Sequence, residues 1–249
     1  MSTIKLLSYN IHKGFTAGNR DFVLSHIRES IRLAGADLVC LQEVLGEHSH
    51  PSAKINDWPT TSQFEFLAHE LWPHFAYGCN SVYEEGHHGN AILSRYPITI
   101  HKNHNISTNF LESRGMLHAE IDLVPGVLHV FNLHLDLLQR GRRKQIEKLC
   151  KMVEQEVEED EPLFIAGDFN DWTGEISKML ENRLGCSEAF IASSGRHART
   201  FPAAFPLLSL DRIYTRNLEI VSATTLADGV WKSLSDHAAI LGEFELIDF

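Results

Sequence analysis

Short apolar stretches in this chain repeatedly stop at polar residues, and this pattern limits the folds that the chain can adopt. Residues 163–166 are apolar and lead into Gly-Asp-Phe-Asn at 167–170, and residues 37–42 lead into Glu43. Short apolar runs of this kind are typical of buried β-strands. Because a sheet presents a site where its strands end, the pattern predicts a sheet-based fold with polar residues gathered at one edge.

The two halves of the chain show the same predicted order of elements. Residues 21–34 place Leu24, Ile27 and Ile31 on one helical face, and residues 139–158 predict a second long helix. Each helix lies between two apolar runs that end in polar residues. We infer two layers whose strand ends meet at one cleft; the alternative is coincidence, because strand–helix–strand units often have this length. The other predicted elements are a helix at 63–71 and strands at 4–11, 37–42, 90–94, 117–123, 127–135, 163–166, 212–215 and 238–244.

Composition narrows the class of protein. The 249 residues contain 43% hydrophobic residues and show no linker, so we expect one domain over residues 1–249. The net charge of −11 argues against a long contact with nucleic acid, although it does not exclude a phosphate-bearing substrate. The chain has no apolar run long enough for a membrane span and no signal-peptide pattern, which predicts a cytoplasmic protein.

Seven short polar motifs stand near the predicted strand ends. They are Ser-Tyr-Asn-Ile-His (8–12), Leu-Gln-Glu-Val (41–44), His-His-Gly-Asn (87–90), Asn-Leu-His-Leu-Asp (132–136), Gly-Asp-Phe-Asn-Asp (167–171), Leu-Asp-Arg-Ile (210–213) and Ser-Asp-His (235–237). In this order they resemble the endonuclease/exonuclease/phosphatase superfamily, with the deoxyribonuclease I-like fold, and the resemblance extends from Asn10 to His237. It implies an α+β fold, a four-layer α/β/β/α sandwich in which helices flank two sheets.

The resemblance implies a divalent metal site. Glu43 is expected to be the principal metal ligand, with Asn10 close by, and Asp236 is expected to join the metal site or to hold its loop. Carboxylate and amide oxygens are hard ligands that suit Mg²⁺, with Mn²⁺ as the alternative. Taken alone, Glu43 reads more simply as a surface carboxylate that follows a strand.

Five further residues receive catalytic roles from the resemblance. His237 is expected to act as general base or to stabilise the phosphate, with Asp211 orienting it. Asp168 would position or activate the attacking water, and Asn170 would donate to a non-bridging phosphate oxygen. A simple Asx turn at residues 167–171 is the local alternative. His134 would bind a phosphate oxygen or protonate the leaving group.

His134 also bears on the subtype. Abasic-site endonucleases of the superfamily tend to carry tyrosine near this place, whereas deoxyribonucleases, sphingomyelinases and several phosphatases carry histidine. Asp136 is a possible partner of His134. The residues expected to bind the substrate are His88, Asn90, Arg114 and Arg199.

Two surface features remain open to more than one interpretation. Arg140, Arg142, Arg143 and Lys144 begin the predicted helix at 139–158, and they either hold a phosphate-bearing substrate or pair with carboxylates such as those of residues 154–161. Residues 47–61 and 193–206 are expected to form loops that select the substrate.

The sequence thus predicts a metal-dependent phosphoric ester hydrolase. We expect in-line attack of water on a phosphodiester in a small molecule or a lipid headgroup. A metal-dependent endo- or exonuclease is the first alternative, and a non-catalytic binding module on the same fold is the second.

Overall fold

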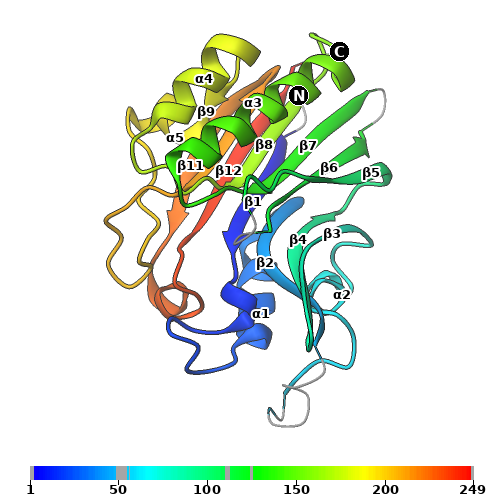
Figure 1. Cartoon of the computed structure of the whole chain (residues 1–249), viewed down its shortest axis with the longest axis vertical. Helices are drawn as coiled ribbons and strands as arrows, with labels where there is room; N and C mark the ends of the chain where they lie inside the picture. Colours follow the sequence, from blue (N-terminus) through cyan, green and yellow to red (C-terminus); the bar gives the residue numbers. More distant parts are fainter. Residues whose placement is uncertain (1–2, 49–54, 56, 110–112, 124–125, 248–249) are drawn as a thin grey trace.

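Two six-stranded sheets packed face to face form the centre of the computed structural model, which describes residues 3–48, 55, 57–109, 113–123 and 126–247 (Figure 1). In spatial order, the first sheet contains β11 (Leu218–Leu226), β12 (Ala239–Leu246), β1 (Thr3–Asn10), β2 (Leu38–His48), β4 (Gly86–Ser94) and β3 (His74–Tyr83). The second contains β5 (Ile98–Asn105), β6 (Gly115–Asp122), β7 (Val127–His134), β8 (Leu163–Asp168), β10 (Asp211–Arg216) and β9 (Ser187–Glu188).

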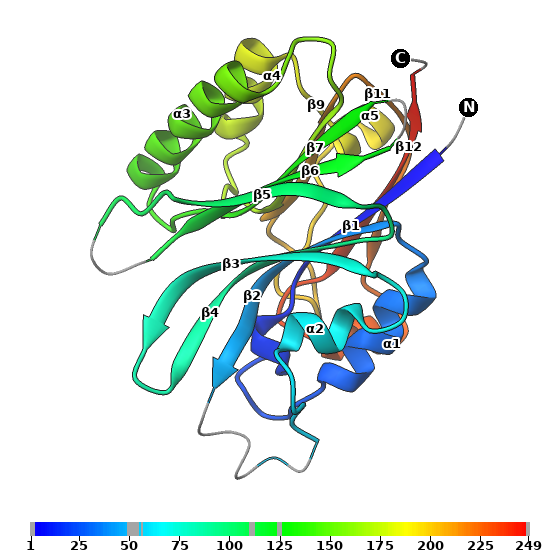
Figure 2. The same ribbon diagram turned by 90° about the vertical axis from the view of Figure 1, so that its right-hand side faces the viewer.

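Helices cover the outer face of each sheet, as the two views together show (Figure 2). The first sheet carries α1 (Leu24–Ala34) and α2 (Gln63–Ala68), and the second carries α3 (Gln139–Glu156) and α4 (Glu175–Leu184). The short helix α5 (Ala189–Ser194) packs against β10 and β11. This arrangement confirms the predicted four-layer α/β/β/α sandwich. Two 3₁₀ helices, at His12–Gly14 and Gly229–Ser233, complete the helical elements of the described residues.

Three apolar layers hold the sandwich together. Along β1, Leu6 faces the core between the sheets, whereas Leu7 and Tyr9 face the core under α1 and α2. A third core joins the second sheet to α3 and α4. Because alternate residues of a strand point to opposite faces, a strand buried on both sides is almost continuously apolar. This double burial explains the apolar runs of the sequence.

The central strands bring the polar motifs to one end of the sandwich. β1 pairs in parallel with β2, and β7 pairs in parallel with β8, so that His134 lies beside Asp168. The side chain of Asn10, at the end of β1, contacts Asp168 across the sheets. The ends of the two strand–helix–strand units therefore meet at one place.

Several predicted boundaries were wrong for local reasons. α1 begins at Leu24 rather than at 21, because Phe22 pairs with Phe15 in an isolated β-bridge. α2 ends at Ala68, and α3 ends at Glu156. The expected loop at 47–61 begins inside β2, and its residues 49–54 and 56 lie outside the described part of the chain. The expected loop at 193–206 begins inside α5.

Within the described ranges, no helix combines the length and the apolar character that a membrane span needs.

Candidate active site

The carboxylate of Glu43 is placed by a bulge within β2. The sequence predicted that Glu43 follows a strand, but β2 continues to His48, and its pairing with β4 shifts register between Leu41 and Val44. Glu43 has a positive φ of 54°, a conformation that is costly for a residue with a Cβ atom. Bulges of this kind redirect side chains and are common beside active sites.

Other strained residues surround the same place. His12 and Lys13 have φ values of 45° and 58°, and Asn170 has a φ of 49°. Each such conformation costs about 1–3 kcal/mol and persists only where the surrounding structure imposes it. Strained residues from three separate segments therefore meet at the strand ends, as expected for a preorganised functional site.

The side chain of Asn10 lies between the carboxylates of Glu43 and Asp168. Its side-chain nitrogen lies 3.4 Å from Oε1 of Glu43 and 3.2 Å from Oδ2 of Asp168. Ser235 holds the backbone of Asn10 through a 2.7 Å hydrogen bond from its hydroxyl group to the Asn10 carbonyl oxygen. Two carboxylates that face one point need a hydrogen-bond donor or a cation between them.

The donor set fits a hard divalent cation. The carboxylates of Glu43 and Asp168 and the amide of Asn10 supply the kind of oxygen ligands that Mg²⁺ and Mn²⁺ prefer. Burial opposes ionisation of Glu43, but the nearby Lys13 and His12 side chains and the hydrogen bond from Asn10 together outweigh it and lower the pKa of the carboxyl group. Glu43 is therefore an anion at neutral pH, ready to bind a cation.

His237 stands between two buried carboxylates. Its Nδ1 lies 2.9 Å from Oδ2 of Asp211, and its Nε2 lies 3.7 Å from Oδ2 of Asp168. Burial lowers the pKa of His237, but the charges of Asp211 and Asp168 more than compensate and raise it to about 10. The ring of Phe201 packs against the imidazole, with the ring centroids 5.1 Å apart. His237 is thus held in one orientation as an imidazolium ion.

Asp168 is a buried carboxylate that contacts both Asn10 and His237. Burial raises the pKa of Asp168 to about 6, although His237 acts in the opposite direction. The backbone N–H of Asn170 donates to Oδ1 of Asp168 over 3.0 Å, so the Asx turn considered from the sequence is present. The side-chain amide of Asn170 donates one hydrogen bond to the carbonyl oxygen of Leu135. Asn170 therefore supports the loop and retains a second N–H for a ligand.

A small hollow beside Glu43 contains four other predicted residues. His88, Asn90, Arg114 and His134 line it together with Glu43. Burial and the nearby Arg114 charge hold the pKa of His134 well below its ordinary value, so the imidazole is neutral. Burial likewise lowers the pKa of His88 to about 4.

His12 and Lys13 are site residues that the sequence analysis did not assign. Nδ1 of His12 lies 3.4 Å from Oδ2 of Asp236 and 3.8 Å from Oε2 of Glu43, and Nζ of Lys13 lies 3.8 Å from the same Glu43 oxygen. In the described part of the chain, Nε2 of His12 is buried without a hydrogen-bond partner. The signal was available, because both residues belong to the Asn-Ile-His-Lys-Gly run that begins at Asn10.

Arg199 is placed away from this cluster. It lines a separate pocket beside α5 and β11, together with Phe190 and Thr224. Its neighbour Thr200 reaches the site indirectly, since its hydroxyl oxygen accepts a hydrogen bond from the backbone N–H of Asp211.

The basic residues at the start of α3 have separate environments. Arg143 pairs with Glu175 rather than with residues 154–161. Arg142 is buried, donates to the carbonyl oxygen of Leu137 and lies 4.9 Å from the centre of the Trp172 ring. These two residues therefore stabilise the start of the helix instead of forming a phosphate site.

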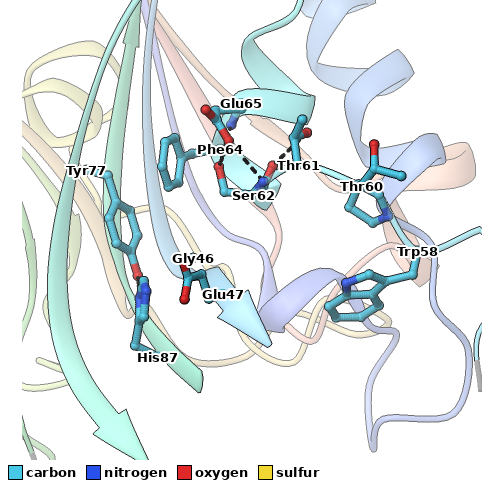
Figure 3. Close-up of a pocket in the computed structure, with 11 residues that line it drawn as sticks. Gly46, Glu47, Trp58, Thr60, Thr61, Ser62, Phe64, Glu65, Tyr77 and His87 are labelled. Atoms are coloured by element: carbon cyan, nitrogen blue, oxygen red, sulfur yellow. Dashed lines mark hydrogen bonds between the residues drawn. The ribbon is translucent and has the colours of Figure 1, made fainter. Parts of the chain in front are cut away.

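A pocket of about 880 Å³ lies beside the ends of β2 and β4 (Figure 3). His87 and His88 are consecutive in β4, and the pocket is lined by His87, whereas the small hollow is lined by His88. Tyr77 and His87 form one wall, with the Tyr77 hydroxyl group 3.0 Å from Nδ1 of His87, and Trp58 lies on the facing wall. The other lining residues are Gly46, Glu47, Pro59, Thr60, Thr61, Ser62, Phe64 and Glu65.

The fold and this site define a class of phosphoester-cleaving proteins, and the comparisons identify the family. The sequence model of the Endonuclease/Exonuclease/phosphatase family matches residues 7–237, and the chain belongs to that family. Members of this superfamily are metal-dependent phosphoesterases or nucleases.

Similar proteins are known at two levels of similarity. The chain is 46% identical over 246 residues to the uncharacterized protein YbhP of Escherichia coli K12, which covers 98% of this chain and 97% of YbhP. D. rerio TDP2 complexed with a single-strand DNA product has a TM-score of 0.73 and 18% identity, covering 98% of this chain and 100% of TDP2. The mannosyl-6-phosphatase Bt3783 of Bacteroides thetaiotaomicron has a TM-score of 0.72 and 17% identity, covering 97% and 99%. The two structures support the fold.

Proposed function

We propose that this protein is a divalent-metal-dependent phosphodiesterase that acts on a small molecule or a lipid headgroup. The observation that carries the proposal is the meeting of Glu43, Asn10 and Asp168 with a charged His237 at one point. Carboxylates alone would repel a phosphate, whereas carboxylates that hold a metal ion beside an imidazolium attract it. A bound Mg²⁺ or Mn²⁺ would supply Lewis-acid polarisation of a phosphoryl oxygen.

The protonation states divide the roles among the site residues. His237 carries a proton and a positive charge, so it stabilises the phosphate rather than acting as the general base. Asp168, with its pKa raised to about 6, is the better candidate to orient and accept a proton from the attacking water. His134 is neutral and lies 3.4 Å from Asp168, where it can contact a phosphate oxygen or the leaving group.

Charge favours a small substrate over a nucleic acid. The whole chain carries a net charge of −11, and two glutamates, Glu47 and Glu65, line the adjacent pocket. A long polyanion would be repelled by such a surface, because nucleic-acid affinity depends on phosphate neutralisation by Lys and Arg. The aromatic and polar walls of the pocket suit an uncharged or cationic group attached to the phosphate.

A substrate panel tests this proposal. Phosphomonoesters, bis(4-nitrophenyl) phosphate, glycerophosphodiesters, phospholipid vesicles and oligonucleotides are each incubated with EDTA, Mg²⁺ or Mn²⁺. We expect metal-dependent hydrolysis of small diesters or lipid headgroups and none in EDTA. Cleavage of oligonucleotides alone would replace the proposal with a nuclease. Undiminished turnover by the Glu43→Ala, His237→Ala double variant would refute the assigned site.

A further inference from the structure

A second cluster of potential ligands lies on the outer face of the second sheet, where α3 ends. His104, His118 and His129 come from the neighbouring strands β5, β6 and β7, and Glu156 is the last residue of α3. α3 crosses this face of the sheet in Figure 2. His129 and His134 are five residues apart on β7, so the cluster is roughly 17 Å along the strand from the candidate active site.

The polar contacts in this cluster need one more proton than its neutral imidazoles supply. Nε2 of His129 lies 3.1 Å from Glu161, Nδ1 of His129 lies 3.0 Å from Nε2 of His118, and Nδ1 of His118 lies 3.4 Å from Glu156. These three contacts each need a proton, but two neutral imidazoles carry only two. If Glu161 fixes the tautomers, the bare Nδ1 of His118 faces a carboxylate oxygen of Glu156. Two acceptors in that position require a cation between them.

The position of His104 indicates that the missing cation is a metal ion rather than a proton, because it supplies a third ligand. In the described part of the chain, Nε2 of His104 is buried and has no hydrogen-bond partner. The ligand atoms of His104, His118 and Glu156 all lie within 4.8 Å of one another. Zinc bonds of about 2.0–2.1 Å place tetrahedral ligand atoms about 3.3–3.4 Å apart, a spacing that the contact between His118 and Glu156 already has.

We propose that His104, His118 and Glu156 form a zinc site whose outer hydrogen bonds run from His118 through His129 to Glu161. Two imidazole nitrogens and one carboxylate oxygen are the ligands of open zinc sites, unlike the oxygen-rich set around Glu43. A ligating histidine commonly donates its other N–H to an acceptor, as the contact with His129 allows.

The surrounding charges permit a cation. The carboxyl end of α3 carries a partial negative charge, and its last turn contains no basic residue. Lys102 approaches the other carboxylate oxygen of Glu156 at 3.9 Å, but its side chain is 58% exposed and can move away. Burial also lowers the pKa of His118 to about 3, which keeps the imidazole neutral as metal binding requires.

Zinc content after chelation tests the site. Wild-type protein and the His104→Ala and Glu156→Gln variants are stripped with EDTA, returned to excess Mg²⁺, titrated with ZnCl₂ and analysed by calorimetry and by elemental analysis after gel filtration. We expect both variants to bind one zinc ion fewer than the wild type, or to bind it at least about 100-fold more weakly. His101→Ala is the matched control, because His101 is an exposed histidine on the same strand.

Thermal stability and Co²⁺ absorption supply independent readouts. Zinc should raise the Tm of the wild type and of His101→Ala but not that of the two ligand variants. Co²⁺ should give the intense visible bands of tetrahedral coordination only when all three ligands are present. Equal zinc content in the wild type and both ligand variants would overturn the site, as would loss of zinc in His101→Ala. If His104→Ala fails to fold, Glu156→Gln decides.

Discussion

Nδ1 of His237 lies 2.9 Å from Oδ2 of Asp211, and Asp211 has no exposed surface at all. The ligand atoms of Asp211, His237 and Asp168 all lie within 4.8 Å of one another, and the charge of Asp211 contributes to the raised pKa of Asp168. Its hydrogen bond is to His237, so we expect it to act on the reaction mainly by fixing the orientation and charge of that imidazole. This relationship separates a positioning residue from the residues that contact the substrate.

Asp211→Asn should lower kcat much more than it changes KM. The amide keeps the shape of the carboxylate but loses its charge, so His237 loses most of the stabilisation of its protonated form. We expect kcat for bis(4-nitrophenyl) phosphate to fall about 10²–10⁴-fold with KM changed by less than about threefold. Asn182→Ala, an exposed change on α4, should leave both constants unaltered. A KM increase with unchanged kcat would contradict the positioning role.

The titration of His237 should reveal the same charge pair in EDTA-treated protein. Because its pKa is raised to about 10 from an ordinary value of 6.5, the ion pair stabilises the fold fully below about pH 6.5 and is lost as the pH rises through 10. Urea unfolding at about pH 6.5 and about pH 9.5 should show a larger loss of stability in the wild type than in His237→Gln. By NMR, the imidazole should be protonated at pH 8 in the wild type and deprotonated in Asp211→Asn. Equal pH dependence in the wild type and His237→Gln would contradict this prediction.

Asn132 should be a main contributor to the joining of the two sheets. Its fully buried side chain donates to the carbonyl oxygens of Leu41 at 2.9 Å and Ala91 at 2.8 Å, and it accepts from Gln42 at 2.8 Å. Asn132→Ala removes these three buried hydrogen bonds, although the Gln42 amide keeps its contacts with Ser8 and Cys40, and should reduce the free energy of unfolding by about 2–4 kcal/mol. Urea denaturation measures the change. Asn182→Ala should stay within about 0.5 kcal/mol of the wild type, and a similarly small change for Asn132→Ala would sink the prediction.

The polar motifs predicted which residues come together better than they predicted the geometry of their contacts. Asn10 and Asp168 end apolar strands, Glu43 interrupts one and His237 precedes one, and strand ends meet at one edge of a sheet. The bulge at Glu43 could not be predicted, since it depends on the register of β2 against β4, which no local signal specifies.

Long side chains were harder to place than short ones. Arg142 and Arg143 are adjacent in the sequence, yet one is buried against backbone carbonyl groups and the other reaches Glu175 on α4. Arg199 lies beside α5 and β11, two elements that the sequence analysis did not predict. A flexible side chain can reach several partners, so its partner depends on tertiary packing that local patterns do not contain.

The pocket beside His87 should affect substrate choice rather than the chemical step. His87 packs over Gly46, where a Cβ atom would meet the imidazole at 1.9 Å, and it contacts the Tyr77 hydroxyl group at 3.0 Å. His87→Ala removes a wall of the pocket and leaves Glu43, Asn10 and Asp168 unchanged. We expect KM for the bulkiest hydrolysed diester to rise about tenfold, with kcat/KM for methyl 4-nitrophenyl phosphate changed less than about twofold. His101→Ala is the control, and an equal loss on both substrates would place His87 in the catalytic machinery instead.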